Sequence, residues 1–208
     1  MNTAQRLLSN TALAFAANVL TKAGNALLFI AIGRWLGPTE SGMFTLGTTY
    51  FTFVVGLSAF GLHEVMVRDL APRRDQSRRY LTNFLALRVL LSLATYGLLV
   101  LGLWLLMPYS AETIRVILIV SLAAIPEAAY TIFQSLFEAH ERLGVLLAAA
   151  VVSTALKLGG GLWLLSTGAT TVDLVWILPV AGAIGLLVFL PATIRLFSQN
   201  PPAAARLG

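Results

Sequence analysis

The sequence has no cysteine, only two histidines, and charged residues at 11% of its 208 positions. Without cysteine it can form no disulfide, no thiolate metal site and no cysteine nucleophile. His63-Glu64 and His140-Glu141 each begin like a zinc-protease helix. Val67 and Gly144 stand where the second histidine would follow. With no phosphate-binding glycine loop and no nucleophile elbow either, the sequence predicts no enzymatic activity, no metal site and no cofactor.

Apolar residues are abundant instead, at 58% of the chain, against roughly 45–50% in soluble domains. A bilayer-crossing helix needs about 20 apolar residues. Six segments have that length: Ala12 to Ile32, Gly42 to Leu62, Phe84 to Leu106, Ile114 to Leu136, Val145 to Leu165 and Leu174 to Ile194. The first continues too far for a signal peptide. The predicted fold class is therefore an all-α membrane protein, a six-transmembrane-helix bundle that forms a single transmembrane domain over residues 1–208.

The net charge of +5 would fit a nucleic-acid partner, but the positions of the arginines favour membrane topology. With a cytoplasmic N-terminus, only Arg34 and Arg115 lie outside. Nine arginines lie inside: Arg6, Arg68, Arg73, Arg74, Arg78, Arg79, Arg142, Arg195 and Arg206. This positive-inside asymmetry predicts a multi-pass protein with a cytoplasmic N-terminus. The basic stretch His63 to Arg79 is expected to touch anionic headgroups, and no nucleic-acid partner is predicted.

Polar side chains recur on one face of five predicted spans, since helix positions three and four apart lie on the same side. The sets are Asn18, Lys22 and Asn25; Thr45, Thr49 and Thr52; Arg88, Ser92 and Thr95; Glu127, Thr131 and Gln134; and Ser153 or Thr154 with Lys157. Threonine often bonds a carbonyl of its own helix. The threonine set alone is therefore interpreted as packing.

Lys22, Glu127 and Lys157 lie near the middle of their spans, where a charge costs at least about 2.5–3.5 kcal/mol. One explanation is a salt bridge between Glu127 and one lysine, which leaves the other lysine unexplained. A water-accessible cavity, net positive through Arg88, explains all three. We therefore predict a binding site for an anionic substrate, formed by Lys22, Arg88, Lys157, Asn18, Asn25 and Glu127.

Small residues and prolines also fall inside the predicted spans. Gly159 to Gly161, and Gly182 with Gly185, are typical of places where helices approach closely. Pro126, Pro179 and Pro191 are expected to bend their spans and free backbone carbonyls.

Short motifs in a fixed order resemble those of bacterial polysaccharide flippases. They are Lys22 to Asn25 with Gly33 to Pro38 and Gly42, Phe60 to Leu62 with Val67 to Ala71, Tyr80 to Asn83 with Leu87-Arg88, and Phe133-Gln134 with Phe137 to Arg142. The chain is identified as a member of the polysaccharide-transport (O-antigen or oligosaccharide flippase) family. That family belongs to a superfamily that also contains multidrug exporters and lipid II flippases. The chain is similar to the N-terminal six-helix lobe of such proteins.

This resemblance implies a function in polysaccharide biosynthesis, such as that of the O-antigen of lipopolysaccharide. Family members move undecaprenyl-pyrophosphate-linked oligosaccharides across the bacterial inner membrane by alternating access. Their central cavity is commonly lined by basic residues, to which Lys22, Arg88 and Lys157 would correspond. Because they usually have two six-helix lobes, the implied partners are the lipid-linked oligosaccharide, membrane lipid, and a second lobe or a second copy of the chain.

Two alternatives remain open from the residues alone. The first is a drug or metabolite exporter coupled to a cation through Glu127, although such an exporter is expected to carry more acidic residues in its spans. The second is a membrane scaffold subunit that transports nothing, in which the polar sets serve packing.

Overall fold

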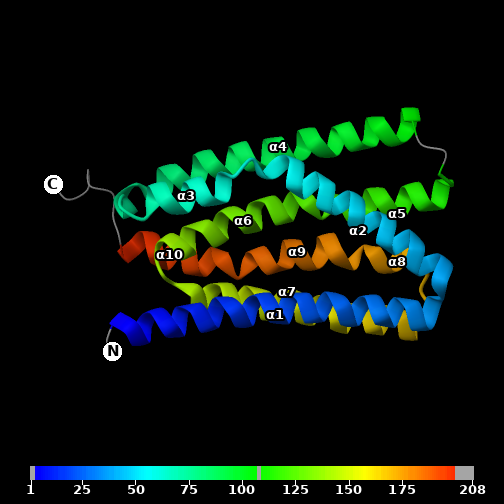
Figure 1. Ribbon diagram of the computed structural model, residues 1–208, viewed down its shortest axis with the longest axis horizontal. Helices are drawn as coiled ribbons and strands as arrows, with labels where there is room; N and C mark the ends of the chain where they lie inside the picture. Colours follow the sequence, from blue (N-terminus) through cyan, green and yellow to red (C-terminus); the bar gives the residue numbers. More distant parts are fainter. Residues whose placement is uncertain (1–2, 107–108, 200–208) are drawn as a thin grey trace.

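The computed structural model describes residues 3–106 and 109–199, in which the regular structure is helical throughout (Figure 1). In chain order the elements are α1 (Thr3–Leu36), α2 (Pro38–Ala59), α3 (Leu62–Leu70), the 3-10 turn η1 (Arg74–Gln76), α4 (Ser77–Leu106), α5 (Ala111–Leu122), α6 (Ala124–Ala139), α7 (Leu143–Ser166), α8 (Thr171–Val175), α9 (Ile177–Leu187) and α10 (Phe189–Gln199). The all-α class predicted from the sequence is confirmed.

Six stretches of this chain are long and apolar enough to cross a membrane, as predicted. They are Thr11–Leu36, Pro38–Ala59, Arg74–Leu105, Ala111–Ala139, Leu143–Ser166 and Thr171–Ser198. The second span was predicted to end at Leu62, but α2 ends at Ala59. Phe60 (φ 45°) and Gly61 (φ 67°) are left-handed there, so Leu62 begins the separate short helix α3.

Two spans are bent, and a proline explains each bend. The helix breaks lie at Ala123, Trp176 and Val188, and each precedes a proline by three residues, namely Pro126, Pro179 and Pro191. A proline has no N–H for the carbonyl four residues earlier, and its ring pushes that carbonyl away. The fourth span is therefore divided into α5 and α6, and the sixth into α8, α9 and α10, which confirms the expected bends.

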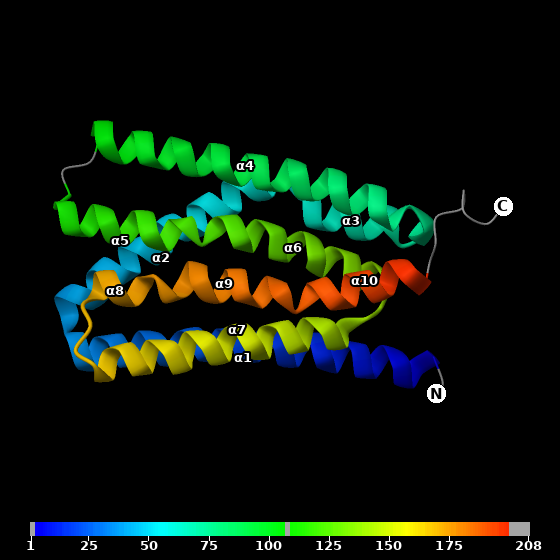
Figure 2. The ribbon, with the colours of Figure 1, turned by 180° about the vertical axis from the view of Figure 1, so that it is seen from behind.

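The spans form an elongated bundle in which α1 lies beside α7, while α8 to α10 run between α7 and α6 (Figures 1 and 2). At the opposite edge lies α4, and α2 crosses the bundle obliquely. One end holds the start of α1, all of α3, the start of α4 and the end of α10, and we call it the terminal end. The arginine-rich segment between α3 and α4 thus lies at the same end as the start of α1.

Two apolar clusters hold the bundle together. The cluster at the terminal end packs α3 against α6 and α10, and its centre is Phe189, whose ring stacks on Phe133 and Phe137 with centroids 5.5 and 5.7 Å apart. The second cluster joins α1, α2, α5, α7 and α8. Along α6 and α7 the two clusters are separated by Glu127 and Lys157, so the polar middle of the bundle lies between two apolar ends.

The contact between α1 and α7 depends on glycine. A Cβ atom built on Gly24 would overlap the methyl group of Thr154, and one on Gly161 would lie 2.6 Å from Cδ1 of Leu28. Small residues at such crossings allow two backbones to approach closely within a membrane. Because threonine is short and branched at Cβ, it cannot swing away from a methyl group added at Gly24.

We therefore expect Gly24→Ala to destabilise the protein by about 1–3 kcal/mol, the usual effect of adding atoms to a packed contact. Thermal unfolding in detergent measures the change. The matched control is Gly97→Ala, where a Cβ would meet nothing within 4 Å. That variant should be neutral or up to about 1 kcal/mol more stable, because alanine is the better helix former. Equal effects of the two substitutions would contradict the close crossing.

Candidate functional site

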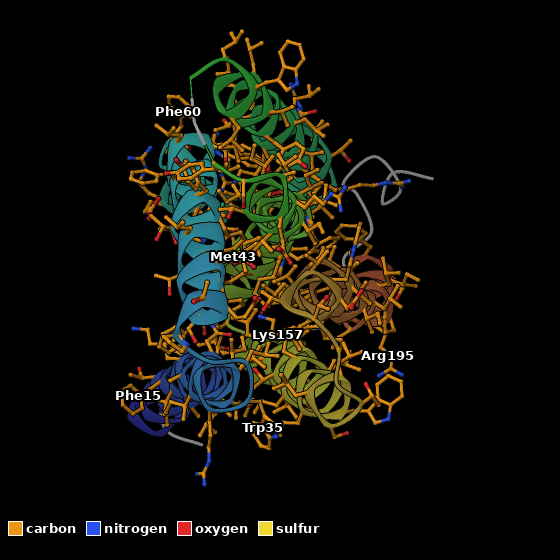
Figure 3. All side chains as sticks on the ribbon, turned by 90° about the vertical axis from the view of Figure 1, so that its right-hand side faces the viewer. Phe15, Trp35, Met43, Phe60, Lys157 and Arg195 are labelled. Atoms are coloured by element: carbon orange, nitrogen blue, oxygen red, sulfur yellow. The ribbon has the colours of Figure 1, made fainter. Side chains whose placement is uncertain are left out.

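Two cavities lie next to each other in the middle of the bundle, and Glu127, Lys157 and Gly182 line both of them. The first cavity has a volume of about 170 Å³ and the second about 430 Å³. Viewed along the bundle, Lys157 lies inside it, whereas Phe15, Trp35 and Arg195 lie on the outside (Figure 3). The shared residues mark the boundary between the two cavities.

The first cavity extends from this boundary toward the terminal end and is lined mainly by polar side chains. On α6 these side chains follow one another along one face: Glu127, Tyr130, Gln134 and Glu138. Asn18 and Thr21 of α1 and Ser153 of α7 complete the polar lining. Since this cavity has both donors and acceptors on its walls, it is suited to hold water or a small polar group.

The second cavity extends the other way and is more apolar, with Phe29, Phe44 and Phe51 on its walls. Its polar residues are Asn25, Thr48 and Thr52, besides the shared glutamate and lysine. Thr45, Thr49 and Thr52 each donate a hydrogen bond of 2.8–2.9 Å to a carbonyl of their own helix. All three threonines are exposed and Thr52 lines the second cavity, so the interpretation of this set as packing is not confirmed.

Glu127 and Lys157 do not form a direct salt bridge. Among the residues that the structure describes, no ion pair within 4.0 Å joins them. The structure therefore does not support a salt bridge between Glu127 and Lys157 as the explanation for the charges within the spans. The two groups instead share the lining of both cavities, where water or a ligand can reach them.

Arg88 is placed differently from the prediction, because it lines neither cavity. It is 2% exposed and donates hydrogen bonds to Oγ of Ser58 (2.9 Å) and to the carbonyl of Val55 (3.4 Å) on α2. Ser92, one turn further along α4, donates to the carbonyl of Ala124 (3.0 Å). Through these hydrogen bonds the polar face of α4 holds that helix against α2 and the start of α6.

Lys22 also lines neither cavity and is exposed on α1. It lies on the same helical face as Asn18 of the first cavity and Asn25 of the second. The structure thus brings four of the predicted site residues together around the two cavities: Asn18, Asn25, Glu127 and Lys157. The expected net positive charge is not found there, because Lys157 is opposed by Glu127. That these residues bind substrate stays a prediction.

Sequence reasoning missed a polar network that shares Gln134 and Glu138 with the lining of the first cavity. His63 of α3 contacts α6 with both ring nitrogens, Nδ1 at 2.7 Å from Oγ of Ser135 and Nε2 at 3.2 Å from Oε2 of Glu138. Gln134 donates to Oε1 of the same glutamate (2.7 Å). The spacing of Gln134 and Glu138 on one helix face was the available signal, but nothing local in the sequence joins His63 to them.

The hydrogen bonds of this network favour a protonated His63. The hydroxyl of Ser135 donates to the carbonyl of Thr131 (2.8 Å), so it can only accept from Nδ1 of His63. Facing Nε2, an ionised Glu138 carboxylate can likewise only accept. The hydrogen bond to Glu138 raises the pKa of His63 above its ordinary value of 6.5, although partial burial acts in the other direction.

Together the fold and its cavities define a multi-pass membrane protein, a bundle of helices that encloses polar space near the middle of its spans. The chain belongs to the polysaccharide biosynthesis protein family, whose family model matches residues 7–204. This membership confirms the family resemblance found in the motifs. No curated protein and no solved structure matches the chain.

The His63 network predicts a pH dependence of stability. A histidine whose pKa is raised on folding contributes stability that is complete below its unfolded pKa and is lost as the pH rises through the folded value. Thermal unfolding of the protein and of His63→Gln from about pH 6 to pH 9 measures this contribution, expected to be on the order of 1 kcal/mol at the acidic end. The difference between the two should shrink as the pH rises.

His140 supplies the control, because burial lowers its pKa and it should act with the opposite sign. Its contribution is present above pH 6.5 and is lost on acidification. A stability difference for His63→Gln that is constant with pH would contradict a charged His63.

Proposed function

We propose that this chain is a membrane lobe of a flippase that moves polyprenyl-pyrophosphate-linked oligosaccharides across the bacterial inner membrane for polysaccharide biosynthesis. O-antigen for lipopolysaccharide is one product that such a protein would serve. The observation that carries the proposal is Lys157, a cation held inside the bundle on the walls of two cavities, in a chain of the polysaccharide biosynthesis family.

Lys157 and the amides on the cavity walls support a partly sugar-like ligand with a phosphate group, although Glu127 balances the charge of the lysine. Lysine acts as a compact point charge that can bind a phosphate oxygen. Asn18 and Asn25 lie on either side of Lys157 along the two cavities and offer amide groups for hydroxyls or phosphate oxygens. The apolar walls of the second cavity, which include Phe44 and Phe51, are suited to the face of a sugar ring or to a prenyl chain.

The exposed position of Lys22 supports a partner half. A lysine that faces hydrocarbon near the middle of a span costs at least about 2.5–3.5 kcal/mol, and Lys22 is the twelfth residue of the 26-residue span Thr11–Leu36. A second lobe, or a second copy of the chain, would cover this face. Cavities of about 170 and 430 Å³ also hold only part of an oligosaccharide, since sites of about 300–1,000 Å³ suit drug-sized ligands.

For the orientation, we propose that the terminal end faces the cytoplasm. The five arginines of the segment from Arg68 to Arg79 lie at this end, together with Arg142 and Arg195. Arg34 and Arg115 lie at the other end. The asymmetry that determines topology is thus gathered at one end of the folded bundle. Of the predicted inside arginines, Arg206 lies outside the described residues, and so does the side chain of Arg6.

The absence of native cysteine allows a direct test of this orientation. Single cysteines at Gln76, in the 3-10 turn at the terminal end, and at Thr170, before α8 at the other end, should be labelled from opposite sides of the membrane. An impermeant thiol reagent applied to intact cells should label only the cysteine at position 170. Labelling at position 76 from outside would reverse the orientation.

A second prediction tests the function itself. In cells from which the gene for this chain has been deleted, Lys157→Gln should fail to restore surface polysaccharide, and lipid-linked oligosaccharide should accumulate. Membrane abundance should stay near normal, because Lys157 has no direct ion-pair partner among the described residues. Arg88→Gln is the contrasting variant. It leaves Ser58 and Val55 without their donor, so abundance and activity should fall together. Full restoration by Lys157→Gln would place the site elsewhere.

Cation-coupled export is the second candidate function, favoured by the position of Glu127 on both cavities. Glu127→Gln distinguishes the two in the same cells. A flippase that uses Lys157 as its phosphate anchor keeps that anchor when Glu127 is neutralised. An exporter driven through Glu127 loses its coupling group, and with it all transport against a gradient.

A further inference from the structure

A third cavity lies at the terminal end, outside the site described above. It has a volume of about 350 Å³ and is formed by the end of α3, the turn η1 and the first turns of α4. Its lining consists of Asp69, Arg73, Gln76, Arg79, Tyr80, Asn83 and Phe84. The third candidate span begins at Arg74. The cavity therefore lies where that span meets the headgroup layer of one leaflet.

The arginines of this corner divide into two groups. Arg68 pairs with Asp69 at 3.0 Å, and Arg74 pairs with Glu141 at 2.9 Å. Within the part of the chain that the structure describes, neither Arg73 nor Arg79 has an ion pair within 4.0 Å. Both of these arginines line the cavity, so its walls carry two positive charges against the single negative charge of Asp69, which Arg68 already engages.

The rest of the lining is amphipathic. Gln76 and Asn83 present amides, which can both donate and accept hydrogen bonds. The rings of Tyr80 and Phe84, which also line the cavity, stack with centroids 5.8 Å apart and planes within 14°. A cavity with guanidinium groups, amides and an aromatic wall matches a ligand that carries a phosphate, neighbouring polar groups and an apolar tail.

We propose that this cavity binds the phosphate headgroup of an anionic phospholipid in the leaflet at the terminal end. Two features of the cavity support this occupant: the positive charge of its lining and its position at the level of the lipid headgroups. Arginine binds phosphate oxygens through two parallel N–H groups, and an anionic leaflet attracts basic residues near its surface. A topology signal needs only arginines on the correct side of the membrane. It does not require two of them to share one cavity with amides and stacked rings.

The test uses the purified chain in detergent, with lipid binding measured by native mass spectrometry. Phosphatidylglycerol should bind the protein, and Arg73→Gln with Arg79→Gln should weaken that binding about tenfold. The matched control is Arg78→Gln with Arg195→Gln, which removes the same charge from the same end but outside the cavity. That control should change binding less than about twofold. Phosphatidylcholine, which has no net charge, should not distinguish the variants.

A second variant guards against misfolding of the double substitution. Asn83→Asp adds a negative charge to the cavity wall at an exposed position, and it should weaken phosphatidylglycerol binding while both arginines remain.

Equal losses in the cavity and control variants would show that net surface charge alone attracts lipid. Displacement by millimolar inorganic phosphate would indicate a site for a soluble phosphate. Preferential displacement by undecaprenyl pyrophosphate would indicate a substrate site. Each of these results overturns the proposal, and none depends on whether the chain is a flippase.

Discussion

The interior of this bundle depends on a close contact between two spans that prolines bend. Pro126 bends the fourth span, and Pro179 is one of two prolines that bend the sixth. The two bent spans meet at Gly182, where a Cβ would lie 3.4 Å from Cγ of Pro126. Gly182 is also one of the residues shared by both cavities. Straight helices would pack along their whole length, whereas bent ones separate on either side of their contact. Both cavities reach this contact, and their other walls come mainly from α1, α2 and α7.

The same bundle holds buried charge in two different ways. Arg88 is enclosed between α4 and α2 with a hydroxyl and a carbonyl as acceptors, so its role can be explained by packing alone. Among the described residues, Lys157 and Glu127 have no ion-pair partner within 4.0 Å, and they line open space. A charge that is satisfied by neighbouring helices is a structural element, while a charge that faces a cavity is available to a ligand. This difference is why Lys157, and not Arg88, carries the proposed function.

Local features of the sequence were sufficient for much of the fold. Apolar runs of the right length predicted all six spans, and Pro126, Pro179 and Pro191 predicted the bends, because the missing N–H acts within one turn. The end of the second span was misplaced, since the left-handed Phe60 gives no sequence signal. The site was predicted less well. Helical periodicity places residues on a face but does not say which face meets another helix, so it grouped Arg88 with Lys157. The contact of His63 with Glu138 joins elements 75 positions apart and leaves no local pattern.

The two cavities also constrain how a large substrate could use this lobe. Glu127 and Lys157 lie where the polar first cavity meets the more apolar second one. A ligand anchored there would have its charged group at the boundary and its bulk outside the lobe, because neither cavity holds more than a fragment of an oligosaccharide. The open face of α1, with Lys22 between Asn18 and Asn25, is the side on which that bulk would lie. Covering this face with a second lobe would enclose the sugar and would also remove the cost of Lys22 in hydrocarbon. On the proposed function, a second lobe that completes the binding site would account for both the exposed lysine and the small cavities.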